Sequence, residues 1–435
     1  MQKIFGTDGV RGVFGEEITP KLAFDIGRAL ALYIKDEDKN ILIAKDTRIS
    51  GDILLTAVIS GITSAGVGVV YMGITTTPAL AFLTKNFGYG CGIMITASHN
   101  SYEYNGIKIF KSNGEKLGPK EEISLTKIYK ALNCFDITQK SKCGSLKVNY
   151  GINNKYINFL KSILPSDIDK KIAFDCANGT TYNILSKLFK DSKNIYLINT
   201  LQNGKKVNEN CGATDTRSLA KFVVENDCDY GFAFDGDGDR VVMVDSLGIL
   251  YDGDDILYNL ALNLKKNNKL KKSTIVGTIM TNKGIENALN KEGINLIRVD
   301  VGDKYIVDKL SCDNLSLGGE SAGHIIAYDY TNTGDGVLTS LIMLEVINAL
   351  GLKKVKATPQ KIVNIACSKV AKIGLFKNKN FAEYIERIKS ENPDFYIVVR
   401  PSGTENKIRI MVDGESEEVV EKLIDDITSK IKQLV

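Results

Sequence analysis

Short apolar runs, each followed by a polar loop, a helical stretch and a second apolar run, recur three times along the chain. The first set comprises Ile41–Ala44, Lys45–Gly51, Asp52–Ala65 and Val67–Met72. The same order recurs at Ile172–Asp175, Cys176–Thr181, Tyr182–Lys190 and Asn194–Asn199, and again at Thr274–Ile279, Met280–Asn282, Lys283–Glu292 and Ile294–Val299. A strand, a crossover helix of this length and a second strand are typical of a βαβ unit. The pattern predicts three α/β domains of similar plan.

The C-terminal part of the chain has a different pattern. Two strand-like runs, Tyr396–Arg400 and Lys407–Val412, flank a loop that contains glycine, and Glu415–Leu434 carries apolar residues along one helical stripe. This pattern predicts a fourth domain. The predicted fold class is therefore α/β, with three similar α/β mixed-sheet domains plus a small C-terminal α+β domain around a central cleft. The predicted domains are residues 1–150, 151–247, 248–358 and 359–435.

Composition argues against nucleic-acid and membrane proteins. The chain has 435 residues, 43% of them hydrophobic and 25% charged, which is ordinary for a soluble protein. Its net charge of +4 is too small to indicate a nucleic-acid partner, and we interpret the basic run Leu264–Lys272 as a solvated helix end and loop. The uncharged stretch Ile53–Thr84 is long enough to span a bilayer, but its glycines favour a helix, a turn and a buried strand. Lys3 and Arg11 stand where a signal peptide would be apolar, so we expect a cytoplasmic protein.

Cysteine and histidine usage narrows the candidate metal chemistry. The eight cysteines are scattered singly, so neither a zinc knuckle nor a C-x-x-C redox motif is supported. Several of them lie in apolar runs and are expected to be buried free thiols, which suits a reducing compartment. The chain has two histidines, His99 and His324, and this excludes a site built from several histidines.

The strongest single motif is Asp235-Gly-Asp-Gly-Asp-Arg240, which follows the apolar run Tyr230–Phe234. Three carboxylates at alternate positions can place their oxygens around one hard cation. The motif is not an EF-hand loop, because Arg240 and Ser246 stand where that loop needs Gly and Glu. It predicts a Mg²⁺ site that still needs oxygens from a phosphate or water. The alternative is an acidic turn whose glycines serve its geometry.

A second candidate site follows the short apolar run Gly92–Ile95. The turn Thr96–Asn100 is small and polar, and a strand that ends in such a turn can hold the side chain of Ser98 at the mouth of a cleft. A serine hydroxyl alone is a poor nucleophile, and among its immediate neighbours His99 is the one base. The alternative interpretation is a polar turn that caps the next segment.

Two further motifs favour phosphate and hydroxyl binding. Arg400-Pro-Ser-Gly-Thr-Glu405, with Arg409 beyond it, has the composition of a phosphate cradle, because it combines hydroxyls, a glycine and two forked guanidinium donors. Gly318–His324 places a carboxylate, a hydroxyl and an imidazole on a glycine-rich loop that suits sugar hydroxyls. Taken alone, each motif is also compatible with an ordinary hairpin loop or turn. The four motifs fall one per predicted domain, and a cleft among four domains would bring them together.

The set of motifs resembles the α-D-phosphohexomutase superfamily. The matching stretches cover the whole chain in order: Phe5–Gly12 (FGTDGVRG), Lys45–Gly51 (KDTRISG), Thr96–Asn100 (TASHN), Asn105–Lys108 (NGIK), Phe234–Arg240 (FDGDGDR), Gly318–His324 (GGESAGH), Thr333–Gly336 (TGDG) and Arg400–Glu405 (RPSGTE). The FGTDGVRG opening is what favours the glucosamine branch over the mannose and glucose branches.

The resemblance implies a Mg²⁺-dependent isomerase that interconverts glucosamine 6-phosphate and glucosamine 1-phosphate, on the route to UDP-N-acetylglucosamine. Ser98 would be a phosphoserine that is primed by a sugar bisphosphate and exchanges its phosphoryl group with the sugar. One Mg²⁺ per chain would be bound by a phosphoserine oxygen on Ser98 and by Asp235, Asp237 and Asp239. The resemblance further implies a phosphosugar as the partner, no nucleic acid, no membrane, and a monomer or homodimer.

The remaining roles are implied in the same way. The transferring phosphoryl group would be surrounded by Arg11, His99 and Lys108, with Lys108 or His324 as a possible proton carrier. Arg240 would lie beside the metal loop. Sugar hydroxyls would be held by Glu320 and its loop, including Ser321. The phosphate that is not reacting would be held by Arg400, Ser402, Gly403, Thr404 and Arg409.

Four positions depart from the superfamily's pattern. Ala322 replaces a serine of the sugar loop, where a lost hydroxyl costs about 1–2 kcal/mol unless Ser321 substitutes for it. Tyr104 resembles the mannose and glucose branches. Ser101 and Asn406 stand where proline is usual. A mutase for glucose or mannose phosphates is therefore the close alternative. The more distant alternatives are a Mg²⁺-dependent phosphatase that uses Ser98 and a non-enzymatic sugar-phosphate sensor.

Overall fold

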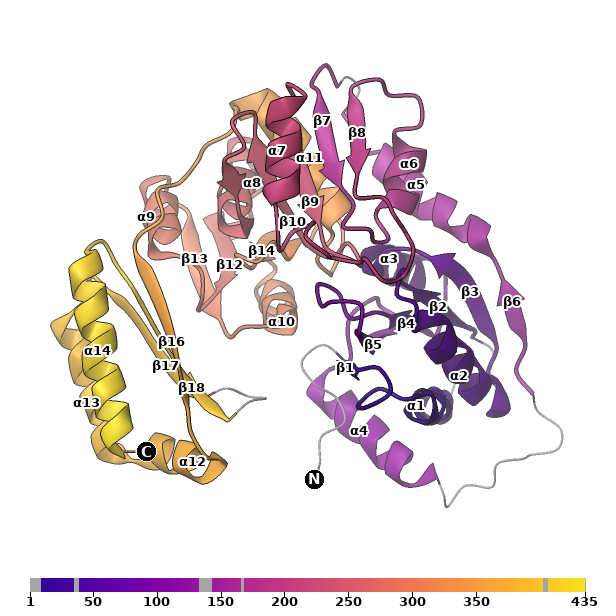
Figure 1. The fold of residues 1–435 in the computed structure, drawn as a ribbon, viewed down its shortest axis with the longest axis horizontal. Coiled ribbons are helices and arrows are strands. Elements are labelled where there is room, and N and C mark those ends of the chain that lie inside the picture. The colour runs from indigo at the N-terminus through magenta and orange to yellow at the C-terminus, as the bar shows by residue number, and fades with distance from the viewer. Residues whose placement is uncertain (1–8, 35–38, 133–142, 166–167, 402–405, 435) are drawn as a thin grey trace.

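The computed structural model describes residues 9–34, 39–132, 143–165, 168–401 and 406–434. Figure 1 shows three α/β units that follow one another around the molecule, and a fourth, smaller unit at the end of the chain. We call these units domains I to IV and define each by its sheet. The observed fold confirms the predicted class of three mixed-sheet α/β domains followed by an α+β domain.

Domain I contains a six-stranded sheet in the order β1-β5-β4-β2-β3-β6. The strands β2, β3, β4 and β6 run parallel to one another. β5 is antiparallel to β4, and the edge strand β1 is antiparallel to β5. The elements are β1 (Val10–Val13), α1 (Pro20–Tyr33), β2 (Ile41–Lys45), α2 (Gly51–Ser64), β3 (Val69–Ile74), α3 (Thr77–Asn86), β4 (Cys91–Ile95), β5 (Tyr104–Lys111), α4 (Pro119–Lys130) and β6 (Leu146–Val148).

Domain II contains a five-stranded sheet in the order β11-β10-β9-β7-β8. β7 runs parallel to β8 and β9, whereas β9 and β10 form an antiparallel pair whose connection is the aspartate motif. The elements are η2 (Tyr150–Ile152), α5 (Asn153–Lys161), β7 (Ile172–Asp175), α6 (Tyr182–Leu188), β8 (Ile195–Ile198), α7 (Arg217–Glu225), β9 (Tyr230–Phe234), β10 (Val241–Asp245) and β11 (Leu250–Tyr251).

Domain III contains a four-stranded sheet in the order β13-β12-β14-β15. Its elements are α8 (Gly253–Lys266), η3 (Lys271–Ser273), β12 (Thr274–Thr278), α9 (Lys283–Lys291), β13 (Asn295–Val299), α10 (Asp303–Asp313), β14 (Leu317–Gly319), β15 (Ile325–Ala327) and α11 (Gly336–Leu350). Local side-chain caps fix the helix starts: Asp252 forms a capping box with Asp255 at α8, and Asp335 accepts from the amide of Leu338 at α11.

Domain IV is a three-stranded antiparallel sheet in the order β16-β18-β17, on which α13 and α14 pack. The elements are β16 (Gln360–Ala366), α12 (Lys369–Lys377), α13 (Lys379–Glu391), β17 (Tyr396–Pro401), β18 (Lys407–Asp413) and α14 (Glu417–Leu434). The two strands and the C-terminal helix predicted here are confirmed. The strands and helices of the three predicted βαβ repeats are confirmed too, with ends that differ by one or two residues.

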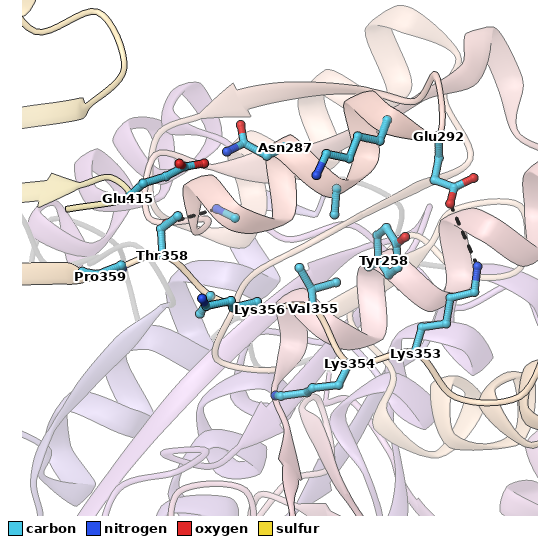
Figure 2. A pocket seen from close by; sticks show the side chains of 14 residues that line it. Tyr258, Asn287, Glu292, Lys353, Lys354, Val355, Lys356, Thr358, Pro359 and Glu415 are labelled. Carbon is cyan, nitrogen blue, oxygen red and sulfur yellow. Dashed lines mark hydrogen bonds and ion pairs between the residues drawn. The ribbon is translucent and has the colours of Figure 1, made fainter. Parts of the chain in front are cut away.

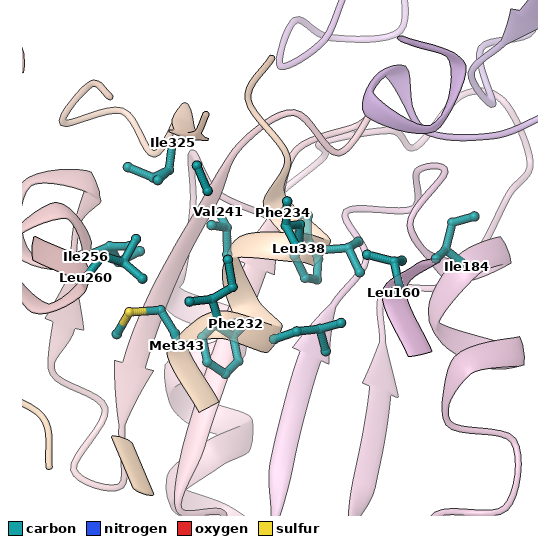
Figure 3. Close-up of a cluster of buried hydrophobic side chains, with 14 of the residues drawn as sticks. Leu160, Ile184, Phe232, Phe234, Val241, Ile256, Leu260, Ile325, Leu338 and Met343 are labelled. Carbon is teal, nitrogen blue, oxygen red and sulfur yellow. The ribbon is translucent and has the colours of Figure 1, made fainter. Parts of the chain in front are cut away.

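One continuous hydrophobic core joins domains I, II and III. It contains Leu42 and Met94 of domain I, Phe174 of domain II, and Leu338 of domain III, all with no exposed surface. Figure 3 shows its central part, where Phe232 and Phe234 of β9 lie against Leu338 and Met343 of α11, beside Ile256 and Leu260 of α8. Domain IV has a separate core, which Ile410 and Ile427 share.

A compact hydrogen-bond cluster connects domain III to domain IV. The Thr358 hydroxyl donates to a carboxylate oxygen of Asp413, the last residue of β18. The side-chain amide of Asn282 donates to the Thr358 carbonyl at 3.0 Å. The Lys283 amide, at the start of α9, donates to the other Asp413 oxygen at 2.6 Å. Beside this cluster lies a cavity of about 710 Å³ between α9 and the linker residues 353–359, with Tyr258 and Glu415 also in its wall (Figure 2).

Among the described residues, no helix is long and apolar enough to cross a membrane. The uncharged stretch Ile53–Thr84 forms most of α2, all of β3 and most of α3, as the glycine positions predicted. Cys91, Cys176, Cys211 and Cys228 are buried free thiols, in agreement with the expectation, whereas Cys143 and Cys312 are exposed and Cys367 is partly exposed. Cys134 lies outside the described residues.

Candidate active site

Ser98 lies in the turn that follows β4, at the junction of domains I and II. The turn requires the left-handed backbone conformation at Ser98, whose φ is 52°. The Ser98 amide donates to the Thr96 hydroxyl at 3.0 Å, and Ser98 is only 2% exposed. Its hydroxyl donates to Asp235 Oδ2 at 2.6 Å, so the first residue of the aspartate motif contacts the predicted phosphoserine directly.

The three aspartates of the motif converge in the loop between β9 and β10. Each of Asp235, Asp237 and Asp239 is at least 97% buried, and each offers one oxygen within 4.8 Å of the others. Asp237 Oδ1 and Asp239 Oδ1 are buried and have no hydrogen-bond partner in the described part of the protein. Buried carboxylate oxygens without partners are costly, and hard oxygen ligands in this arrangement fit a divalent cation.

Domain I supplies the groups that compensate this negative charge. Lys108, on β5, is 1% exposed and donates from Nζ to Asp237 Oδ2 at 2.8 Å and to Asp239 Oδ2 at 3.0 Å. The Thr77 hydroxyl, in the first turn of α3, also donates to Asp237 Oδ2, at 2.6 Å. The loop therefore depends on both domains, and Lys108 lies among the carboxylates rather than free for a ligand.

The pKa values of two aspartates in the cluster, Asp235 and Asp239, are shifted in opposite directions. Burial and the neighbouring charges of Asp239 and Asp237 hold the pKa of Asp235 well above its ordinary value. Burial alone would also raise the pKa of Asp239, but the charges of Lys108 and His324 outweigh it, and that pKa lies well below its ordinary value. A cation at the cluster would favour the ionised form of Asp235, so cation binding and proton release are coupled.

Two arginines and a histidine lie beside the Ser98 turn. Burial and the charges of Arg240 and Arg11 lower the pKa of His99 to about 4, so its imidazole is neutral at pH 7. His99 Nδ1 is 3.4 Å from the Ser98 hydroxyl. Arg11 donates to the Asn100 side chain at 3.0 Å, and the Arg240 amide donates to Asp235 Oδ1 at 3.1 Å. Arg11, His99 and Arg240 thus lie close to one another beside the Ser98 turn.

The Gly318–His324 loop reaches the same cluster through His324. His324 Nδ1 is 3.8 Å from Asp239 Oδ1, and Nε2 is 3.6 Å from Asp303, which also pairs with Lys116 at 2.6 Å. The Gly334 amide donates to Nε2 at 3.2 Å, so a neutral His324 carries its proton on Nδ1, facing Asp239. Burial opposes protonation, but Asp239 and Asp303 outweigh it and raise the pKa of His324.

Glu320 and Ser321 lie at the edge of this loop, and both are partly exposed. A carboxylate oxygen of Glu320 accepts from the Gly302 amide at 3.0 Å, and the Ser321 carbonyl accepts from the Gly253 amide at 2.9 Å. These bonds hold the loop against the starts of α8 and α10 within domain III. They leave a second carboxylate oxygen of Glu320 and the Ser321 hydroxyl as groups that can contact a ligand.

The proposed phosphate cradle is on domain IV. Arg400 of β17 and Arg409 of β18 are directly opposite one another in the antiparallel pair. Burial and the Arg409 charge lower the pKa of Arg400. Ser402, Gly403 and Thr404 lie outside the described residues. The structure thus gathers the Ser98, aspartate and His324 motifs in one cluster, whereas the two arginines are on the separate domain at the other end of the chain (Figure 1).

Sequence reasoning missed several residues that hold this cluster together. Thr77, Lys116 and Asp303 contact it but stand in no motif. Asn208 donates across the domain I–II junction to the Ser98 carbonyl at 2.9 Å, and no local pattern marks it. Arg48 was assigned no role within the matching stretch Lys45–Gly51, yet it is fully buried and donates to the carbonyls of the Ser98 turn. The local signal available for Arg48 was its position in the loop that follows the buried strand β2.

Family models and full-length relatives both match this chain from its first domain to its last. Four family models match in order, described as Phosphoglucomutase/phosphomannomutase alpha/beta/alpha domain I at residues 2–133, domain II at 154–248, domain III at 252–365, and C-terminal domain at 362–430. A phosphoglucosamine mutase of Caldicellulosiruptor saccharolyticus is 42% identical, with 99% of each chain covered. One of Clostridioides difficile is 38% identical, with 100% of this chain and 99% of that protein covered.

Solved structures show the same fold. A phosphoglucomutase/phosphomannomutase family protein of Burkholderia thailandensis superposes with a TM-score of 0.82 at 22% identity, covering 100% of this chain and 98% of that one. An N-acetylphosphoglucosamine mutase of Aspergillus fumigatus, solved in complex with GlcNAc-6P and magnesium, has a TM-score of 0.64 at 16% identity, covering 99% and 95%.

Proposed function

The chain belongs to the phosphoglucomutase/phosphomannomutase family, with phosphoglucosamine mutases as its full-length relatives, and on this basis we propose that it interconverts glucosamine 6-phosphate and glucosamine 1-phosphate. The observation that carries the proposal is the 2.6 Å contact between the Ser98 hydroxyl and Asp235, inside a buried three-aspartate cluster. A hydroxyl in this place is suited to carry a phosphoryl group whose charge needs compensation.

We propose that Ser98 is phosphorylated in the active enzyme and that a sugar bisphosphate primes it. A hydroxyl oxygen of the sugar phosphate attacks the phosphorus, the bond from phosphorus to Ser98 Oγ breaks, and the bisphosphorylated sugar forms. After the intermediate turns round, Ser98 Oγ attacks the phosphorus of its other phosphate, the bond from that phosphorus to the sugar oxygen breaks, and Ser98 is phosphorylated again. The sugar hydroxyl's proton leaves to a base in the first step and returns in the second, so that atoms and charge balance over the cycle.

The aspartate cluster is proposed to hold one Mg²⁺, through Asp235, Asp237 and Asp239 together with an oxygen of phosphorylated Ser98. The orphaned oxygens of Asp237 and Asp239 support this assignment. When bound, the ion would neutralise charge on the transferring phosphoryl group. Arg11 and Arg240 lie beside the same turn and would stabilise the same charge.

Two residues are candidates for the proton. Lys108 donates from Nζ to Asp237 and to Asp239, so it lies next to the place where the phosphoryl group would be transferred. His324 has Nε2 occupied by the Gly334 amide and Nδ1 directed at Asp239, which suits holding that carboxylate in place. Both residues contact the aspartate cluster, so we propose either Lys108 or His324 as the proton carrier.

Domain IV is proposed to hold the phosphate that is not reacting. Arg400 and Arg409 would bind it together with Ser402, Gly403 and Thr404, while Glu320 and Ser321 contact sugar hydroxyls. A mutase needs this second phosphate site because the intermediate carries two phosphates, whereas a phosphatase does not. We also propose domain boundaries near residues 150, 247 and 358, a cytoplasmic location, a monomer or homodimer, and no nucleic-acid partner.

The test is a coupled assay with Mg²⁺ and a bisphosphate primer, in which glucosamine 6-phosphate and glucose 1-phosphate are offered separately. A higher kcat/KM for the amino sugar is the expected result. A higher kcat/KM for glucose 1-phosphate would instead assign the chain to neutral sugars, as Tyr104 and Ala322 suggested. Release of free phosphate as the main product would contradict mutase activity altogether.

A further inference from the structure

Two side chains, Arg48 and Asn208, donate hydrogen bonds to the backbone carbonyls of Ser98 and Asn100 in the Ser98 turn. The Ser98 carbonyl accepts from Arg48 Nη2 at 2.9 Å and from Asn208 Nδ2 at 2.9 Å. The Asn100 carbonyl accepts from the same two atoms, at 2.7 Å and 3.0 Å. Because Ser98 has a left-handed backbone that a non-glycine residue rarely adopts, the turn needs such contacts to persist.

The two donors differ in their origin. Arg48 follows β2 of domain I, the same domain as the turn, and its Nε donates to the buried carboxylate of Asp46 at 2.9 Å. It therefore fixes the turn relative to its own sheet. Asn208 belongs to domain II, in the long connection between β8 and α7, and its backbone amide donates to the Ala177 carbonyl at 2.9 Å.

Asn208 also lies against the aspartate loop. A Cβ atom built on Gly236, the residue between the first two aspartates, would lie 2.9 Å from the Ser98 carbonyl oxygen and 3.1 Å from Asn208 Nδ2. The Ser98 turn, the aspartate loop and the Asn208 amide thus meet at one point with no room for a side chain at residue 236. Asn208 bridges the two halves of the site at the place where they touch.

The chemistry of the amide suits this task. Nδ2 has two hydrogens, which serve the two carbonyl oxygens, and Oδ1 is buried with no partner among the described residues. The orientation of the amide is fixed, because the opposite one would place Oδ1 against both carbonyls. Aspartate has the same shape but lacks these donors, and it would repel both carbonyl oxygens.

From these contacts we infer that Asn208 is a positioning residue, which aligns the Ser98 hydroxyl with the aspartate cluster across the domain I–II junction. The inference rests on the proposed function for the role of Ser98, although the contacts themselves do not. An error in alignment between nucleophile and metal loop lowers the rate of phosphoryl transfer more than the affinity for substrate. The expected signature is a fall in kcat with little change in KM.

The experiment compares Asn208→Asp with Asn183→Asp as the matched control. Asn183 also donates from domain II to a domain I carbonyl, that of Ile74 at 3.1 Å, but Ile74 ends β3 and is not part of the Ser98 turn. We expect Asn208→Asp to lower kcat by about 10–100-fold, with KM changed by less than about threefold. Asn183→Asp is expected to keep kcat within about threefold of the wild-type value, at a similar Tm.

A second variant, Asn208→Gly, separates the loss of the two hydrogen bonds from an effect of misfolding in Asn208→Asp. Asn208 has a φ of 59°, so Asn208→Gly removes both donors without backbone strain and is expected to show the same fall in kcat. Wild-type kcat in both Asn208 variants, or equal losses in Asn208→Asp and Asn183→Asp, would overturn the inference.

Amide hydrogen exchange in the Ser98 turn is measured without substrate. The Asn100 amide donates to the Ala97 carbonyl at 3.1 Å, and its exchange is expected to speed up in both Asn208 variants and not in Asn183→Asp. Unchanged exchange would also overturn the inference. If the wild-type protein lacks mutase turnover but the turn loosens as expected, the proposed function fails and the alignment contact stands.

Discussion

Arg400 and Arg409 face each other directly across β17 and β18, two cations in register on adjacent antiparallel strands. Like charges directly opposite each other on adjacent strands repel, and the same two guanidinium groups offer forked donors on one face of the sheet. An anion between the two guanidinium groups would remove the repulsion, and a phosphate matches their forked donors.

This arrangement predicts that Arg400→Ala weakens substrate binding without destabilising the fold. The loss of one charge-assisted contact, about 1.5–3 kcal/mol, would raise KM by about 10–100-fold. Tm is expected to change little, because Arg400 is only partly buried on β17 and is not part of the hydrophobic core of domain IV. The control is Lys361→Ala on β16, whose ammonium pairs with Glu421 at 3.0 Å. A collapsed Tm with unchanged KM would instead make Arg400 a structural residue.

Replacing Ser98 by alanine tests the nucleophile. We expect Ser98→Ala to lose mutase turnover by more than about 1,000-fold, because the phosphoryl group would then have no acceptor oxygen at the position of Ser98 Oγ. Its Tm should fall by a few degrees, because the hydrogen bond to Asp235 is lost while Ala and Ser have similar strain at a φ of 52°. Ser101→Ala, in the same turn and exposed, is the control. Normal turnover in Ser98→Ala would rule out the mechanism.

Lys108→Met tests charge compensation in the aspartate cluster. Removal of a buried ammonium that pairs with Asp237 and Asp239 is expected to lower the free energy of unfolding by about 3–5 kcal/mol without metal. Millimolar Mg²⁺ should raise Tm more in this variant than in the wild-type protein, because the ion takes over the same carboxylates. Thermal melts with and without Mg²⁺ measure this difference.

The control for that experiment lies on the same strand. Lys111→Met removes a partly exposed ammonium that pairs with Glu115 at 2.9 Å, and it should not change the response to Mg²⁺. Equal Mg²⁺-induced shifts in Lys108→Met and the wild-type protein would place the ion elsewhere than at the aspartate cluster.

Asp254 predicts a pH dependence of stability. Burial raises its pKa to about 7, against the lowering effect of the hydrogen bond from the Asn282 amide. Because the folded pKa lies above the unfolded one, the folded state holds a proton that the unfolded state has lost between about pH 4 and pH 7. The stabilisation is present below that window and is lost as pH rises through it, by up to about 1.4 kcal/mol for each pH unit.

Asp254→Asn should therefore flatten this dependence. The difference in Tm between pH 5.5 and pH 8 is expected to shrink in the variant, while the exposed control Asp329→Asn keeps the wild-type difference. An unchanged difference in Asp254→Asn would show that other groups dominate the pH response. Chemical unfolding at both pH values gives the same comparison in free energy.

The pattern of hydrophobic and polar residues predicted those structural features that are determined by residues close together in the sequence. β9 begins and ends where its apolar run does, because a strand buried on both faces excludes charged residues along its length. The aspartate loop was predictable for a similar reason: three carboxylates and two glycines within five residues already limit the chemistry.

Residues whose role depends on distant contacts were not predictable. Asn208 and Ser98 are 110 positions apart, and Thr77 and Asp237 are 160 apart, so no local window contains both partners. An asparagine in a loop is ordinary, and only the domain I–II packing places its amide on two carbonyls. The same limit applies to Asp303, whose contact with His324 depends on how α10 packs in domain III.

The division of the hydrophobic core has a consequence for how the protein unfolds. Because domains I, II and III share one core, loss of packing in any of them exposes apolar surface of the other two, so they should melt together. Domain IV has its own core and a narrow polar connection at Thr358 and Asp413, so its melting is separable. We therefore expect the chain to unfold as two cooperative units, with domain IV able to lose its structure while Ser98 and the aspartates stay assembled.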